Sequence, residues 1–210
     1  MKKLDILIQA IARSRDQGRT PTDAQRSAIL NAASICINNN ELELLKRLVR
    51  AEDINHDNTA GMTLLHHGAA VGNGVAVRFL LGLNPKLEAV RNCAIRPNHK
   101  ITGTPLLFAV SCYKHLAIEL QLQKALQQLP LLRAFSKLRE SKQIIIDLLS
   151  AGADLDNPGI SMFPSQSFAL SPREMMVGVC EEILIEFESK AIASATEGLE
   201  RVGVANQHRL

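Results

Sequence analysis

The residues best suited to chemistry are two cysteines and two histidines near the middle of the chain. Cys112 and His115 have the spacing of two ligands on one helical face, and Cys93 and His99 come shortly before them. Four such ligands can close a tetrahedral zinc site. The spacing is loose, however, and Cys112 is also explained as a small buried residue at the end of a helix. We therefore predict no metal and keep zinc as the alternative.

The chain shows none of the common catalytic motifs. Gly72 and Gly74 lack the third glycine and the preceding strand of a dinucleotide fingerprint. No glycine-rich loop ends in Lys-Ser or Lys-Thr, and no serine lies in a G-x-S-x-G sequence. His66 and His67 have no partnered nucleophile. We predict a protein that is not an enzyme and uses no cofactor; a helical enzyme domain would need clustered titratable residues in a cleft.

Composition excludes several classes of protein. Hydrophobic residues make up 46% of the 210 residues and aromatic residues 3%, so Leu, Ile and Ala must fill the core, as suits helices. Few aromatic residues and a net charge of +3 argue against nucleic-acid binding. Four cysteines without regular spacing indicate reduced thiols and a cytoplasmic location. No apolar run reaches transmembrane length, and charges interrupt the N-terminus too often for a secretory signal.

The stretch 61–88 predicts two short helices joined by a tight turn. Thr63 can cap the first helix, and the sequence 72–74 supplies residues that tolerate positive φ. Asn84-Pro85 then ends the second helix. Two helices this short cannot bury their apolar faces alone, so they require similar units stacked on either side.

This unit resembles an ankyrin repeat, whose pattern is roughly G-x-T-P-L-H-x-A-A-x-x-G-H followed by an apolar helix and G-A-D-V-N. The matching residues are Gly61, Thr63, Leu65, His66, Ala69, Gly72, Val77, Leu80 and Leu81, and the departures are Leu64, Gly68 and the sequence 83–85. The stretches 104–110 and 144–156 match the two halves of another repeat. The resemblance implies an all-α solenoid with a rigid surface for protein partners. It also implies that His66 bonds backbone groups of neighbouring loops.

The resemblance divides the chain into one domain of stacked units over 1–194, with long connecting loops. The expected parts are an N-terminal capping helix at 1–19, repeats at 20–57, 58–98 and 99–157, a fourth repeat or C-terminal cap at 158–194, and a flexible tail at 195–210. Two connections, 89–103 and 157–170, are expected to be loops because they carry no repeat pattern.

The third repeat contains an insertion at about 113–143. Apolar residues recur there at helical spacing on both sides of Pro130, which predicts a protruding antiparallel helical hairpin. The alternative is an additional helical pair folded over the stack. The cations Lys124, Arg133, Lys137 and Arg139 suggest a second site on this hairpin, for an acidic partner.

The predicted function is binding of an unidentified protein partner by a monomer, without nucleic acid. Binding would use the concave face formed by loops and inner helices. The candidate contacts are Asp57, Asn58, His67, Val71, Arg91, Arg96, His99, Lys100, Phe108, Ser111 and Met162. Two alternatives are an ankyrin-repeat effector that an intracellular bacterial pathogen secretes into a host cell, and a membrane-surface adaptor that uses the amphipathic N-terminal helix.

Overall fold

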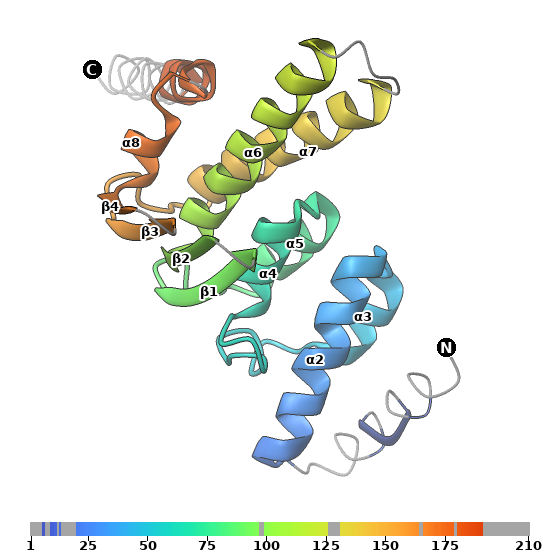
Figure 1. Cartoon of the computed structure of the whole chain (residues 1–210). Coiled ribbons are helices and arrows are strands. Elements are labelled where there is room, and N and C mark those ends of the chain that lie inside the picture. The colour runs from blue at the N-terminus through green and yellow to red at the C-terminus, as the bar shows by residue number, and fades with distance from the viewer. Residues whose placement is uncertain are drawn as a thin grey trace, which may run out of the picture.

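The protein is mostly helical and carries one small antiparallel sheet (Figure 1). The computed structural model describes residues 6, 9–11, 13, 20–96, 99–125, 131–163, 166–178 and 180–190. It describes their side chains except at 93–96, 99–100, 125, 131–132, 161–163 and 166–168. Of the predicted N-terminal helix, the described residues are helical, and Ile11 is buried in the core. The predicted tail lies outside the described residues.

Two helical pairs form the first half of the chain. They are α2 (Asp23–Asn39) with α3 (Leu42–Leu48), and α4 (Leu64–Val71) with α5 (Gly74–Leu81). The predicted caps are confirmed, because the Thr63 hydroxyl accepts a hydrogen bond from the backbone of His66 at the start of α4. Gly72 ends the same helix at φ 74°, a left-handed conformation that glycine adopts without strain.

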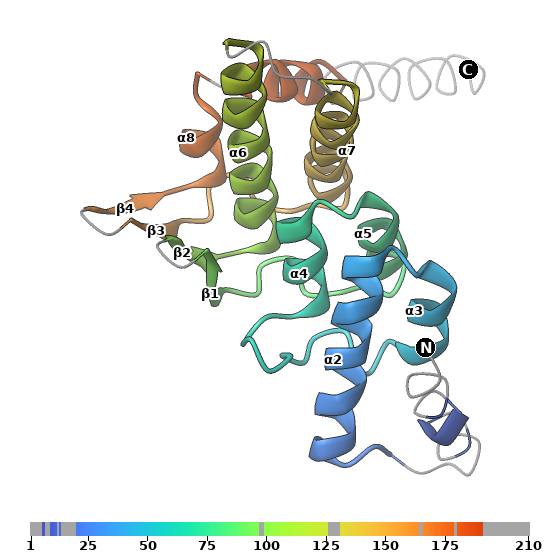
Figure 2. The ribbon, with the colours of Figure 1, turned by 45° about the vertical axis from the view of Figure 1, so that its right-hand side comes forward.

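The second half contains two long helices, α6 (Pro105–Ala125) and α7 (Leu131–Ser150), which pack on each other in opposite directions (Figures 1 and 2). The 21 residues of α6 span about 31 Å. The distal ends of this pair extend past α4 and α5 (Figure 2). The predicted join near Pro130 lies outside the described residues. A short helix, α8 (Pro172–Met176), and helical residues 181–190 follow.

The expectation that both long connections are loops was wrong, so the mostly helical fold that the sequence predicts also carries a small antiparallel sheet. The connections form β1 (Arg91–Arg96), β2 (His99–Gly103), β3 (Gly159–Phe163) and β4 (Gln166–Leu170), paired antiparallel in that order. Pairing satisfies the backbone N–H and C=O groups that an isolated loop would leave to water. Because β2 pairs with β3, the sheet joins two segments that are far apart in the sequence.

Each helical pair packs on the next. Helix α4 contacts both α2 and α6, α5 contacts α3 and α7, and α6 contacts α8, so the pairs form a row along the molecule. The aliphatic side chains between them make one continuous core. Polar bonds add to this packing: Asn58 Nδ2 donates to Ser34 Oγ at 3.0 Å, and Glu140 of α7 accepts from the backbone of Gly74 at 3.1 Å. The apolar core and these hydrogen bonds together fix each helical pair against its neighbour.

Candidate protein-binding face

His66 has a structural position, as the family resemblance implied. Its imidazole is fully buried, and Nε2 lies 2.9 Å from the Ala89 carbonyl and 3.2 Å from that of Gly103. Carbonyls only accept, so Nε2 must carry the proton, and Nδ1 then accepts from the Thr63 hydroxyl at 2.7 Å. Burial lowers the pKa of His66 to about 4. A neutral imidazole therefore ties α4 to the two ends of the β1–β2 hairpin.

The exposed side of α2, α4 and α6, here called the inner-helix face, carries large aliphatic side chains. Ile35 is 53% exposed, Val71 46%, Ile118 44% and Leu122 59%. Each stands in a helix whose opposite side is already buried in the core. Three successive helices thus each present at least one aliphatic side chain to solvent.

The three helices of the inner-helix face are linked to one another (Figures 1 and 2). Nε2 of His67 on α4 bonds Oδ1 of Asn38 on α2 at 3.0 Å. A Cβ placed on Gly72 at the end of α4 would stand 3.6 Å from Sγ of Cys112 on α6. The hydrogen bond and the packing of α4 against both α2 and α6 place the exposed aliphatic side chains on connected helices.

Four of the predicted contact residues are accessible. Val71 is exposed and His67 is half-buried on the inner-helix face. Burial lowers the pKa of His67, so its imidazole is neutral at pH 7. Asp57 and Arg91 pair across the start of β1, with Oδ1 and Nε 2.6 Å apart, and both remain partly exposed.

Three predicted contacts are corrected because their side chains are buried. Phe108 is fully buried and packs edge-on against the His66 ring, 5.2 Å between centroids. Asn58 is buried because its amide organises the turn before α4, where Oδ1 accepts from the backbone of Ala60 and Met62. Ser111 is buried on α6. The side chains of Arg96, His99, Lys100 and Met162 lie outside the described ones, so their roles stay predictions.

Sequence reasoning missed Ile35, Ile118 and Leu122. A usable signal existed, because Ile118 and Leu122 are four residues apart and therefore lie on one side of α6. Apolar spacing in a long helix does not say which stripe faces the core. Only the packing of α6 against α4, α7 and α8 shows that the side chains of Ile118 and Leu122 remain exposed to solvent.

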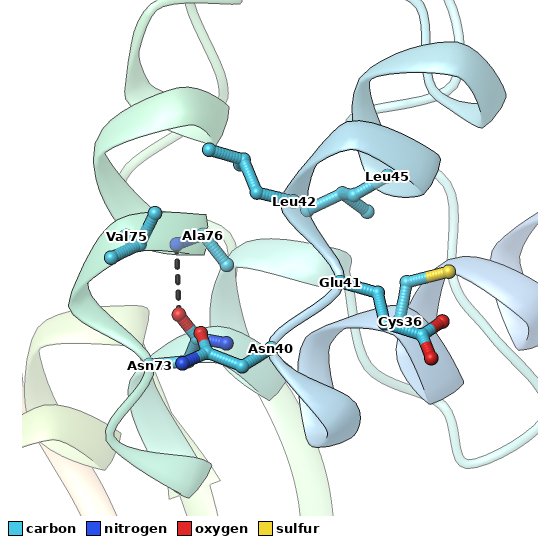
Figure 3. A pocket seen from close by; sticks show the side chains of 8 residues that line it. All are labelled: Cys36, Asn40, Glu41, Leu42, Leu45, Asn73, Val75 and Ala76. Atoms are coloured by element: carbon cyan, nitrogen blue, oxygen red, sulfur yellow. Dashed lines mark hydrogen bonds between the residues drawn. The ribbon is translucent and has the colours of Figure 1, made fainter.

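Two of the cysteines with described side chains, Cys36 and Cys180, are poorly suited to nucleophilic chemistry. Burial raises the pKa of the Cys36 thiol to about 11 and that of Cys180 to about 12, so both are protonated at neutral pH. Cys36 lines a shallow pit between the α2–α3 turn and the start of α5, where Asn73 bonds the backbone of Ala76 (Figure 3). The pit belongs to the junction between two helical pairs.

The proposed zinc ligands are only partly described. Cys112 lies on α6, and Nε2 of His115 is 3.7 Å from a carboxylate oxygen of Glu119. The side chains of Cys93 and His99 are outside the described ones. Within the part of the chain that the structure describes, no three His, Cys, Asp or Glu side chains are grouped to hold a metal ion.

The four cations of the long hairpin do not share one face. With 3.6 residues per turn, Arg133 and Lys137 lie on one side of α7, and Arg139 is turned from them by about 120° and 160°. Lys124 belongs with Arg139, because its Nζ stands 4.9 Å from the centre of the Phe135 ring on that other side. The predicted acidic-partner site is therefore two separate surfaces.

Comparison with known proteins gives no match, either to a protein family or to a curated protein. Among the described helices, none is both long and apolar enough to cross a membrane.

Proposed function

We propose that this protein is a non-enzymatic binding module of the ankyrin-repeat type, and that its inner-helix face holds a partner protein. Support for the repeat architecture comes from the row of helical pairs α2–α3, α4–α5 and α6–α7, each packed on the next. Further support comes from the cap residues Thr63 and Gly72 and the buried His66, whose positions in the sequence resemble the ankyrin pattern.

The observation that carries the binding proposal is the aliphatic surface left on three consecutive inner helices. Ile35, Val71 and Ile118 are exposed although the cores beneath them are complete. Because these side chains are about half exposed, covering the rest of each is worth roughly 0.7–1.5 kcal/mol. The partner segment that fits is a helix or loop with aliphatic anchors.

Site-specific photocrosslinking in the producing cells tests this proposal. A photoreactive side chain at Val71 lies on the inner-helix face, whereas one at the exposed Arg47 lies on the outer helix α3. We expect one protein adduct from position 71 that position 47 does not give. No adduct from position 71, or the same adduct from both positions, would contradict the proposal. Charge removal at Arg96 and Lys100, followed by pull-down of the captured protein, tests their separate predicted contribution.

A further inference from the structure

A second surface lies on the long hairpin, away from the inner-helix face. We name it the α7 flank and define it as Phe135, Arg139 and Lys142 of α7 together with Lys124 of α6. Spacings of four and three residues place the three α7 side chains within about 60° of one another around the helix. Phe135 is 43% exposed, and Lys124 Nζ lies 4.9 Å from its ring centre. The α7 flank is thus an exposed aromatic ring between cations.

One end of the α7 flank already holds an acidic helix of this chain. Lys142 Nζ lies 2.8 Å from a carboxylate oxygen of Glu186, which belongs to helical residues 181–190. Phe187, the next residue, packs against the core, and Glu182 accepts a hydrogen bond from Tyr113 on α6. Lys142 and Lys190 lower the pKa of Glu186 to about 2. The occupied part therefore shows which chemistry this flank accepts: a charged carboxylate next to an apolar side chain.

The rest of the α7 flank has the same chemistry, but no occupant of this kind comes from the residues that the structure describes. Within the described chain, neither Lys124 nor Arg139 is bonded to a carboxylate, and Phe135 remains open to solvent. The glutamates of 181–190 are already engaged: Glu181 with the backbone of Gly178, Glu188 with Arg173 and Glu186 with two lysines. This internal pairing disfavours a second copy of the chain as the partner.

We propose that Phe135, Arg139 and Lys124 form a docking site for an acidic amphipathic segment of another protein, continuing the contact that residues 181–190 make with Lys142. The apolar side chain of the segment covers the Phe135 ring, and its carboxylates pair with the guanidinium and ammonium groups on either side. Exposed ion pairs add little affinity by themselves, so Phe135 supplies the anchor and the cations supply specificity for acidic sequences.

The test uses short synthetic helical peptides that share an aliphatic stripe and carry Glu, Gln or Lys at the remaining positions. Binding to the full chain is followed by fluorescence anisotropy at low and at physiological salt. We expect the Glu series to bind most tightly and to weaken as salt increases. Phe135→Ala and Arg139→Glu should each weaken binding by about tenfold.

Arg133→Glu is the matched control, because it makes the same charge change on the same helix but on the other side. Binding of the Glu peptide should change by less than about twofold in this variant. Equal losses from Arg133→Glu and Arg139→Glu would overturn the proposal, because they would reflect only net charge. Absence of binding by every Glu peptide would also overturn it, as would binding of phosphatidylserine vesicles but not peptides.

This site is independent of the inner-helix face. Val71→Asp should leave peptide binding unchanged, so failure of one proposal leaves the other standing. Circular dichroism of each variant confirms that the substitutions, all at exposed or partly exposed positions, leave the helices intact.

Discussion

The buried imidazole of His66 makes the stability of the fold depend on pH. Its pKa is about 4 in the folded protein and 6.5 as a free side chain, chiefly because burial disfavours the charged form. Nearby Arg91 lowers the pKa further, while Asp57 and the carbonyls of Gly103 and Ala89 oppose the shift. Between pH 6.5 and about 4 the unfolded chain binds a proton that the folded chain does not. Stability is therefore complete above pH 6.5 and falls as the pH is lowered.

The magnitude follows from the two pKa values. Each unit of difference is worth about 1.4 kcal/mol, so complete titration of His66 costs about 3 kcal/mol of unfolding free energy. Between pH 7.5 and 4.5 the expected loss is about 2.5 kcal/mol. Protonation of carboxylates that are paired in the folded protein also lowers the unfolding free energy as the pH falls. The contribution of His66 must therefore be isolated by substitution.

Urea denaturation of the native chain and of His66→Gln between pH 7.5 and 4.5 isolates the contribution of His66 to the unfolding free energy. We expect the variant to be less stable at pH 7.5, because an amide cannot reproduce all three contacts of the imidazole, and its pH slope to be shallower by about 2.5 kcal/mol over the range. His56→Gln, at an exposed histidine, should retain the native slope. Equal slopes for the native chain and His66→Gln would refute a neutral, buried His66.

Three further substitutions test the packing. Ser141 is fully buried on α7, and its hydroxyl has no hydrogen-bond partner in the described structure. Ser141→Ala should therefore raise the unfolding free energy by about 1 kcal/mol. A lower unfolding free energy would show that the hydroxyl is bonded. Gly159→Ala should lower it by about 1–3 kcal/mol, since the added Cβ would lie 2.6 Å from the Thr102 carbonyl oxygen and disturb the β2–β3 pairing; an unchanged urea midpoint would contradict this register. Thr63→Val keeps the side-chain shape but removes both the helix cap and the partner of His66 Nδ1, so thermal unfolding should show an unfolding free energy lower by about 1–2 kcal/mol. A smaller loss of unfolding free energy than for the same substitution at an exposed threonine, such as Thr59, would argue against the cap.

The helices could be predicted because their signals are local. Thr63 and Gly72 act within a few residues of themselves, and the structure places both caps where the sequence predicts them. The strands were missed because their pairing is not local: β2 bonds β3, almost 60 residues away in the printed sequence. A weaker signal was available in the sequence, since Pro97-Asn98 and Pro164-Ser165 consist of residue types that are common in turns.

The candidate face was predictable only in outline. The repeat pattern indicates which helices are inner, and this placed Val71 and His67 correctly at the surface. It could not separate buried from exposed positions on α6, so Phe108 was assigned to the surface and Leu122 was overlooked. Burial on α6 depends on three neighbouring helices, including α8, whose approach no residue of α6 reveals.

The affinity of the captured partner for variants of the inner-helix face tests the central claim most directly. Val71→Asp and Ile118→Asp place a carboxylate in the aliphatic surface, while Ile185→Asp makes the same change at an exposed isoleucine elsewhere. We expect each of the first two to weaken binding by about tenfold or more and the third to leave it unchanged. Equal affinity for all three variants would contradict the assignment of this face as the binding site.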